Sequence, residues 1–222
     1  ILGDANSASV AAADISTIAG DTSGTVTVSN NINLTGTAAE ITTAVADVNS
    51  FSGTPTATLS NAHTLAQLKA INNAVDGTLT LNDVTVALVG SAADIKAALA
   101  GTFAAGYTGN VTITDADGTE IAATDISTIA GDTAGTVTVQ NNINITGTAA
   151  EITTAVGDVD TFSGTPTAAL SNAHTLAQLK TINDAISGQL TLTDYTVALS
   201  GTSAQVAAAL DGTFAAAYTG AA

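Results

Sequence analysis

The residues in this chain that could do chemistry are few, and they recur at a fixed interval. The only imidazoles are His63 and His174, which occupy the same place in two copies of the segment NAHTLAQLK. Each precedes the threonine of a predicted helix start, where a ring can pack over the helix, so we predict a structural role for both. No GxSxG, HExxH, P-loop or GxGxxG motif is present, and a serine nucleophile needs a base within hydrogen-bond reach. We therefore expect no enzyme activity and no catalytic residue.

Calcium is the most credible small ligand. The segment TDADGTE offers Asp115, Asp117 and Glu120 around Gly118, and carboxylate oxygens on a turn are ligands that calcium prefers. The later ligands of an EF-hand are missing, and turns rich in Asx residues also form through local hydrogen bonds. These three acidic residues are the predicted metal site, and no other cofactor is expected.

The charge of the chain excludes several kinds of partner. The net charge is -16, and the only basic residues are Lys69, Lys96 and Lys180. Nucleic-acid binding depends on basic side chains that contact phosphates, so we expect no nucleic-acid partner. No apolar stretch approaches the roughly 20 residues that span a bilayer, so we expect no membrane insertion. Cysteine is absent, which excludes disulfides and thiolate metal sites.

The chain is built from an internal duplication. The segment TGTAAEITTAV occurs at residues 35–45 and again, unchanged, at 146–156, which is 111 positions later. We divide the chain into two repeats, 1–111 and 112–222, and each repeat into four shorter passages. The passages start near residues 1, 25, 54 and 78 in the first repeat, and near 110, 136, 165 and 189 in the second.

Each passage has the same order of predicted elements: a strand, often a second strand, a capping box, a helix and a glycine. The strands alternate apolar and polar residues, as in Thr25–Val28. A capping box pairs a threonine with a Glu or Gln three residues later, and it predicts helix starts at Thr37, Thr64, Thr148, Thr175 and Thr202. Asp14 and Asp125 are expected to cap the shortest helix of each repeat. Glycines are expected to stop most helices or to start the next turn, as at Gly20, Gly53, Gly77, Gly109 and Gly131.

One passage cannot bury its apolar side alone, so neighbouring passages must stack. We therefore predict an α/β repeat solenoid of about eight strand–(strand)–helix coils, continuous along the chain, with a parallel β-ladder. The alternative is an ordinary pair of separate 111-residue α/β domains.

The chain contains two whole periods of 111 residues, and it begins and stops inside one coil. No polar capping coil, which usually closes an isolated solenoid, is visible. We expect the partners to be copies of the same chain in a head-to-tail homopolymer, or further tandem repeats.

Threonines in T-x-T pairs suggest a second kind of function. If the coils stack in register, these pairs would form a regular, outward-facing array of hydroxyl and methyl groups; they are Thr25/Thr27, Thr56/Thr58, Thr78/Thr80, Thr112/Thr114, Thr136/Thr138 and Thr191/Thr193. Such arrays are similar to those of solenoid antifreeze proteins, although threonine is also a common solvent-facing strand residue. The alternative function is thus a solenoid binding module for glycan, calcium or ice.

Acidic, cysteine-free repeats such as GTVTVSNNINLTGTAAEI resemble the tandem-repeat regions of large secreted bacterial surface proteins, of the adhesin and extracellular-fibre type. The resemblance covers the whole chain in composition and architecture, and it implies an extracellular or cell-surface setting. The leading prediction is a non-enzymatic structural protein that forms or extends a filament or stalk by coil stacking and head-to-tail contact.

Overall fold

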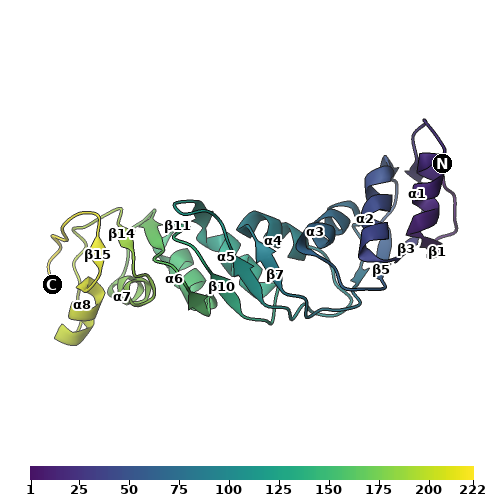
Figure 1. Cartoon of the computed structure of the whole chain (residues 1–222). Coiled ribbons are helices and arrows are strands. Elements are labelled where there is room, and N and C mark those ends of the chain that lie inside the picture. Colours follow the sequence, from purple (N-terminus) through teal and green to yellow (C-terminus); the bar gives the residue numbers. More distant parts are fainter. The chain divides into compact units, whose positions relative to one another are not determined.

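The computed structural model describes residues 1–222 as an α/β protein with eight helices and fifteen strands (Figure 1). All strand pairings are parallel, as predicted, and the β-α order repeats along the chain. The helices are α1 (Ala12–Gly20), α2 (Ala38–Asp47), α3 (Leu65–Ala74), α4 (Ala92–Leu99), α5 (Ala123–Gly131), α6 (Ala149–Asp158), α7 (Leu176–Ala185) and α8 (Ser203–Leu210).

The strands are short. In the first half of the chain they are β1 (Ser9–Ala11), β2 (Thr27–Val28), β3 (Asn33–Gly36), β4 (Ser50–Phe51), β5 (Thr56–Leu59), β6 (Leu79–Thr80) and β7 (Leu88–Gly90). In the second half they are β8 (Val111–Ile113), β9 (Glu120–Ala122), β10 (Val137–Val139), β11 (Asn144–Gly147), β12 (Thr161–Phe162), β13 (Thr167–Leu170), β14 (Gln189–Thr191) and β15 (Thr213–Phe214).

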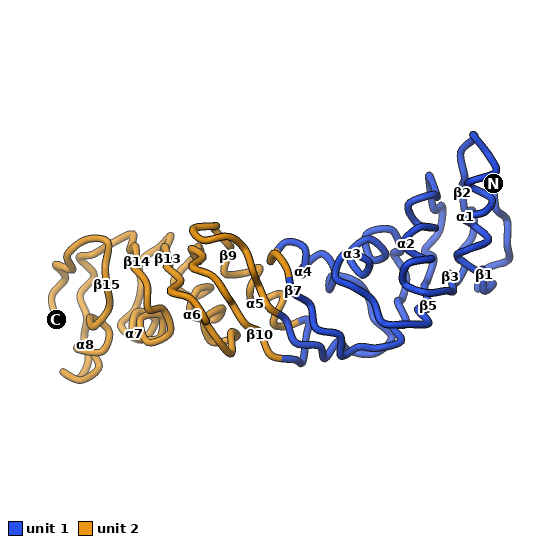
Figure 2. Tube along the Cα trace, in the orientation of Figure 1, with its two compact units in different colours: residues 1–89, 93–111, 132–135 blue, residues 90–92, 112–131, 136–222 orange.

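The chain forms two compact units, which Figure 2 shows in different colours. Unit 1 contains residues 1–89, 93–111 and 132–135. Unit 2 contains residues 90–92, 112–131 and 136–222.

Unit 1 has a sheet with the strand order β1-β3-β5-β6, and a separate pair formed by β2 and β4. The register follows the repeat, because Asn33 of β3 pairs with Ser9 on one side and with Thr56 on the other. Helix α2 packs against both α1 and α3. The first three passages of this unit therefore contact one another through both their strands and their helices.

Unit 2 repeats this arrangement. Its larger sheet has the order β15-β14-β13-β11-β9, and β12, β10 and β8 lie in that order in a second sheet. Asn144 pairs with Glu120 and with Thr167, as its counterpart Asn33 does with its own neighbours. Helices α5, α6, α7 and α8 pack in sequence order. The core of both units consists of small aliphatic side chains, since the strands turn residues such as Leu34 and Ile145 inward, where both are fully buried.

The predicted capping boxes are confirmed at all five threonines: Thr37, Thr64, Thr148, Thr175 and Thr202. In each, the threonine hydroxyl accepts from the backbone N–H three residues later, and the Glu or Gln side chain accepts from the threonine N–H. The prediction for Asp14 and Asp125 was wrong. Helix α1 begins after Ala11, so Asp14 lies in the first turn rather than at the cap, and Asp125 lies in the first turn of α5. The shortest helices are α4 and α8.

The prediction that glycine stops the helix was wrong for four of the eight helices. The residues that follow α2, α3, α6 and α7 are Val48, Val75, Val159 and Ile186, all in extended conformation and buried. A buried aliphatic residue draws the chain back onto the core, and this ends the helix without a left-handed glycine. Gly20 and Gly131 are the last residues of α1 and α5, whereas Gly53, Gly77 and Gly109 lie beyond the helix ends.

The threonine pairs do not form one array in unit 1. Thr27 lies in β2, which pairs with β4, whereas Thr56 and Thr58 lie in β5, which pairs with β3 and β6. A shorter row does form, because Thr58 pairs with Thr35 on one side and with Thr80 on the other. The predicted single regular array was therefore wrong for unit 1, since the threonine pairs lie in two different sheets.

None of the helices combines the length and the apolar character that crossing a bilayer requires.

Candidate functional site

Side chains of Asn and Asp join neighbouring passages by hydrogen bonds to the backbone. Asn31 Oδ1 accepts from Thr54 N at 2.8 Å, and its counterpart Asn142 Oδ1 accepts from Thr165 N at 2.7 Å. Similar bonds are made by Asn6 to Asn31 N, Asp117 to Asn142 N, Asn49 to Val26 N and Asp160 to Val137 N. The bonds of Asn31, Asn142, Asn6 and Asp117 join successive passages, so they fix how one passage stacks on the next. The bonds of Asn49 and Asp160 each lie within a single passage.

A second set of these bonds caps helices from the following passage. The N–H of Ala38, the first residue of α2, donates to Asn61 Oδ1 at 2.8 Å, and the N–H of Ala149 in α6 donates to Asn172 Oδ1 at 2.7 Å. The N–H groups of a first helical turn have no partner within the helix. The side chain of the next passage supplies this partner, so each of these helices is completed only when its neighbour is stacked on it.

The three predicted calcium ligands have separate places in the structure. Asp115 Oδ2 accepts from Ala92 N at 2.7 Å, at the start of α4, and Asp117 Oδ1 accepts from Asn142 N at 2.8 Å. Glu120 is exposed on β9. No group of three or more His, Cys, Asp or Glu side chains is placed to share a metal ion. Two of the three carboxylates thus serve the contacts between passages, and calcium binding stays a prediction.

The glycines after the helices are needed where the backbones of two passages meet closely. A Cβ atom on Gly77 would lie 2.4 Å from the carbonyl oxygen of Pro55, and one on Gly188 would lie 2.3 Å from that of Pro166. Real Cβ atoms do not approach a carbonyl oxygen so closely, and here the obstacle is backbone rather than a movable side chain. These positions explain why glycine recurs with the period of the repeat.

The two histidines lie in equivalent, buried environments, each within its own unit. His63 Nε2 lies 3.2 Å from Tyr107 Oη, and that hydroxyl donates to the Val86 carbonyl at 2.5 Å. His174 Nε2 lies 3.1 Å from Tyr218 Oη. Burial lowers the pKa of both imidazoles, although Asp83 and Asp194 act in the opposite direction. Both side chains are 4% exposed, so the predicted structural role fits their surroundings better than a reactive one.

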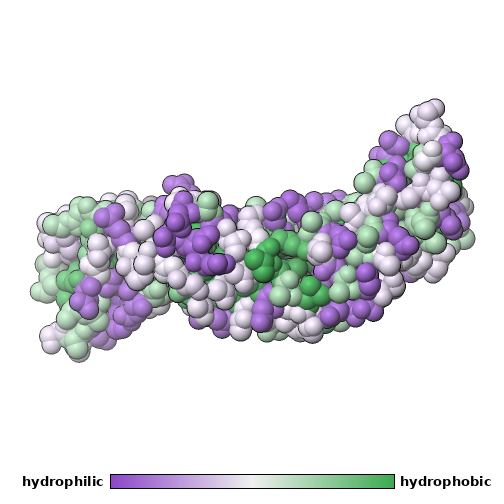
Figure 3. Space-filling model, viewed as in Figure 1, coloured by the Kyte–Doolittle hydropathy of each residue, from purple (hydrophilic) through white to green (hydrophobic).

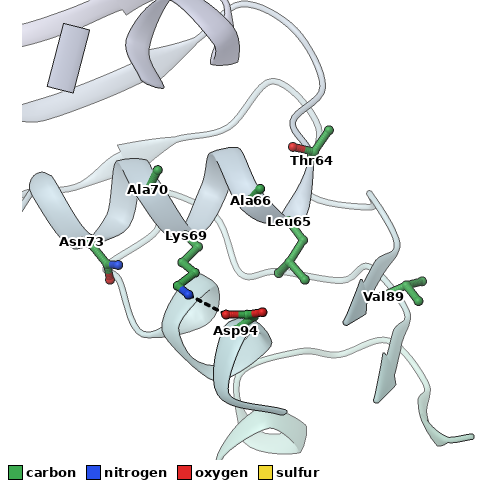
Figure 4. Close-up of a pocket in the computed structure, with 8 residues that line it drawn as sticks. All are labelled: Thr64, Leu65, Ala66, Lys69, Ala70, Asn73, Val89 and Asp94. Atoms are coloured by element: carbon green, nitrogen blue, oxygen red, sulfur yellow. Dashed lines mark hydrogen bonds and ion pairs between the residues drawn. The ribbon is translucent and has the colours of Figure 1, made fainter. Parts of the chain in front are cut away.

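An open groove lies beside α3 in unit 1, with a volume of about 690 Å³. Figure 4 shows Leu65, Lys69 and Ala70 along one side of it, with Lys69 directed toward Asp94, to which it forms an ion pair of 2.5 Å. Val89, at the far side of the groove, is 58% exposed. Besides this ion pair, the lining contains the polar residues Thr64 and Asn73 and the apolar residues Leu65, Ala66, Ala70 and Val89.

The equivalent groove of unit 2 has different side chains. Ser200 and Gln205 stand where Val89 and Asp94 stand in unit 1, and Lys180 pairs with Asp184 of its own helix instead. The residues that line the groove therefore differ between the two repeats. The Asn and Asp bonds between passages differ less. On the visible surface, hydrophobic residues appear as patches among hydrophilic ones (Figure 3).

Comparison of the chain with protein-family models, with curated proteins and with solved structures gives no match.

Sequence reasoning missed the Asn and Asp bonds between passages. A signal for them was present, because Asn31 and Asn61 recur 111 residues later as Asn142 and Asn172. Their partners could not be identified from the sequence, since each acceptor lies 23 residues from its donor in bonds such as Asn31 to Thr54.

Proposed function

We propose that the chain is a non-enzymatic structural repeat protein. Its eight passages stack as the coils of one continuous α/β solenoid made of two repeats, 1–111 and 112–222. In this proposal the solenoid forms or extends a filament or stalk by head-to-tail contact. The partners are copies of the same chain or further tandem repeats of the same kind.

The observation that carries this proposal is an unpaired strand edge in each unit. Strand β1 is the outermost strand of its sheet in unit 1, and β15 is the outermost strand of its sheet in unit 2. The free edge of a strand presents N–H and C=O groups that act as a template for another strand. A further passage of the same kind would satisfy these groups in the way that neighbouring passages already satisfy each other.

The setting we propose is extracellular or at the cell surface. It rests on the resemblance of these repeats to secreted bacterial surface proteins, and on their acidic, cysteine-free composition. A protein that works through stacking needs no reactive side chain, and His63 makes a structural contact with Tyr107 through Nε2.

The negative charge of the chain makes the proposed assembly dependent on salt. A net charge of -16 on each copy opposes association. Salt screens this repulsion, because the Debye length falls to about 10 Å at 0.1 M ionic strength. We therefore expect association to increase with ionic strength, as long as the contact itself is mainly apolar and hydrogen-bonded.

Electron microscopy and light scattering of the purified chain test this function. Samples at several concentrations are compared in low and in physiological salt. Regular filaments of constant width that lengthen with concentration are the expected result. Particles of the size of one chain under all of these conditions would contradict the proposal and would favour the binding-module alternative.

A further inference from the structure

The 111-residue period relates the exposed first and last passages to contacts found inside the chain. Residues 1–29 correspond to 112–140, and residues 197–221 correspond to 86–110. Bonds within the chain confirm that equivalent residues behave alike. Gln140 N donates to Ile113 O at 3.0 Å, and Ser29 N donates to Leu2 O at 3.1 Å. Leu88 N donates to Asn110 O, and Leu199 N donates to Ala221 O.

Four hydrogen bonds, two within each unit, join residues of the range 112–140 to residues of the range 86–110. Within unit 2, Thr114 N donates to Gly90 O at 2.8 Å and Ala92 N to Asp115 Oδ2 at 2.7 Å. Within unit 1, Ala134 N donates to Tyr107 O at 2.9 Å and Thr133 Oγ1 to Gly109 O at 2.7 Å. The corresponding pairs, by the same period, are Gly3 with Gly201, Asp4 with Ser203, Ser23 with Tyr218 and Thr22 with Gly220.

Every member of these four corresponding pairs keeps the group that the bond requires. Asp4 retains the carboxylate of Asp115, and Thr22 retains the hydroxyl of Thr133. The other bonds need only backbone N–H or C=O groups, and none of the residues involved is proline. Asp4 and Ser203 are both exposed, and so is Thr22, whereas Thr133 is 9% exposed.

The local geometry of both surfaces is already formed. Thr22 Oγ1 accepts from Gly24 N at 3.0 Å, as Thr133 Oγ1 accepts from Gly135 N at 3.0 Å. The Tyr218 hydroxyl donates to Val197 O at 2.6 Å, as Tyr107 does to Val86 O at 2.5 Å. A contact between these surfaces would therefore require little reorganisation, which lowers the cost of association.

Apolar side chains at these two surfaces are more exposed than their counterparts. Ile18 of α1 is 43% exposed, whereas Ile129 of α5 is 0% exposed. Val206 and Leu210 of α8 are half-buried, and the residues that correspond to them, Ile95 and Leu99 of α4, are buried. Burial of apolar surface contributes roughly 25 cal/mol for each Å² removed from water. The counterparts of side chains that are buried inside the chain are thus partly exposed to solvent in its first and last passages.

We propose that these surfaces bind each other between two copies of the chain, with the first passage of one copy docked on the last passage of the next. The register is that of the internal contacts, so Asp4 of one copy accepts from the Ser203 N–H of the other. This inference rests on the proposed function and adds the residues that meet. The occupant is a second copy because each required group is supplied by the periodic counterpart of a residue that makes the same bond internally.

Cysteine cross-linking tests this register, since the chain has no cysteine of its own. The variant Asp4→Cys with Ser203→Cys is treated with a short bismaleimide and resolved on a denaturing gel. A ladder of dimers and larger oligomers is expected. As a positive control, Ala92→Cys with Asp115→Cys should cross-link within one chain. As a negative control, Asp4→Cys with Asp211→Cys places the second thiol at the other end of α8, about 12 Å away along a helix of 8 residues.

A second pair of variants tests the Ser203 bond itself. Ser203 is the first residue of α8, after Thr202, whose φ of -72° and ψ of 154° accept a following proline. Ser203→Pro therefore keeps the helix but removes the backbone N–H that would donate a hydrogen bond to Asp4 of the other copy. We expect it to weaken association about tenfold relative to Ser203→Ala, as loss of one bond to a charged acceptor does.

The outcomes separate the inference from the proposed function. Filaments that form without the Asp4 to Ser203 cross-link, or equal association of the Ser203→Pro and Ser203→Ala variants, would overturn the register and leave the function intact. A chain that stays monomeric at every concentration and salt level would overturn both.

Discussion

His63 and Tyr107 are joined by a hydrogen bond that fixes the tautomer of the histidine. Tyr107 donates its hydroxyl hydrogen to Val86 O, so the His63 Nε2–H must donate to Tyr107 Oη, which lies 3.2 Å away. Nδ1 of His63 is then an acceptor, and it is buried without a hydrogen-bond partner. Nδ1 of His174 is in the same situation. A proton on either Nδ1 would therefore be placed in a buried site with no acceptor.

The stability of the chain should consequently fall with acidification. Burial lowers the pKa of His63 and His174 in the folded state, whereas the unfolded value is about 6.5. The unfolded chain then binds protons that the folded chain does not, and the free energy of unfolding decreases as the pH falls from about 7 toward the lower folded pKa. Urea denaturation at a series of pH values measures this slope.

The double variant His63→Gln with His174→Gln is the control for this prediction. In this variant the free energy of unfolding should no longer change with pH between about pH 7 and pH 5. It should still decrease with acidification below about pH 4. This decrease comes from carboxylates such as Glu40 and Asp83, whose pKa values are lowered by hydrogen bonds to nearby threonines. An unchanged slope near pH 6 in the double variant would show that the histidines are not its source.

Gly77→Ala should destabilise the chain because of the close approach of its backbone to Pro55. The added Cβ would lie 2.4 Å from the Pro55 carbonyl oxygen, and overpacking of this kind costs about 1–3 kcal/mol. Gly131→Ala is the matched control, since nothing lies within 4 Å of the added Cβ at the end of α5. That control should be neutral or should stabilise by about 0.5–1 kcal/mol. Thermal denaturation of the two variants compares them, and equal effects would refute the argument.

Asn49→Ala should destabilise the passage that starts near residue 25. It removes the acceptor of the Val26 N–H, a bond of 2.7 Å, and a lost hydrogen bond of this type costs about 0.5–1.5 kcal/mol. The chain itself offers the control, because Asp160 fills the same role for Val137 in the second repeat. Asn49→Asp should therefore remain close to the unchanged chain in urea denaturation. Equal decreases in the free energy of unfolding for Asn49→Ala and Asn49→Asp would mean that the acceptor oxygen at position 49 does not contribute to stability.

Ser7→Gly should stabilise the chain. Ser7 has a φ of 64°, in the left-handed region, and its counterpart in the second repeat is Gly118 with a φ of 77°. A residue with a Cβ pays roughly 1–2 kcal/mol in this region, and glycine does not. We expect an increase of about 1 kcal/mol in the free energy of unfolding, less the entropy that glycine adds to the unfolded chain. The reverse change, Gly118→Ser, should destabilise, and a gain from both would contradict the explanation.

Calcium should have little effect on the melting temperature. Asp115 and Asp117 accept backbone N–H groups from different residues, and no cluster of three acidic or histidine side chains is present. Melting in millimolar calcium and in chelator should give the same temperature. A rise that saturates with calcium, and that Asp117→Asn abolishes, would instead support the site predicted from the sequence.

Local patterns were sufficient to predict where most helices begin and that the strands pair in parallel. A capping box such as Thr37 with Glu40 needs only residues three positions apart, so its geometry is contained in the sequence. The periodic alternation of apolar residues likewise predicted the buried positions, as at Val26 and Val28. The predictions failed where a helix ends, because buried Val48 rather than Gly53 decides this for α2.

The sequence by itself determined the repeat, the helix starts and the acidic, cysteine-free character of this protein. Only the tertiary structure decided which passages face each other, and therefore why Gly77 lacks a side chain, which N–H group Asn31 accepts from and which one Asp115 accepts from. The physical reason is that capping and alternation depend on neighbours in sequence. A bond between passages depends instead on stacking, which brings together residues that are 23 positions apart.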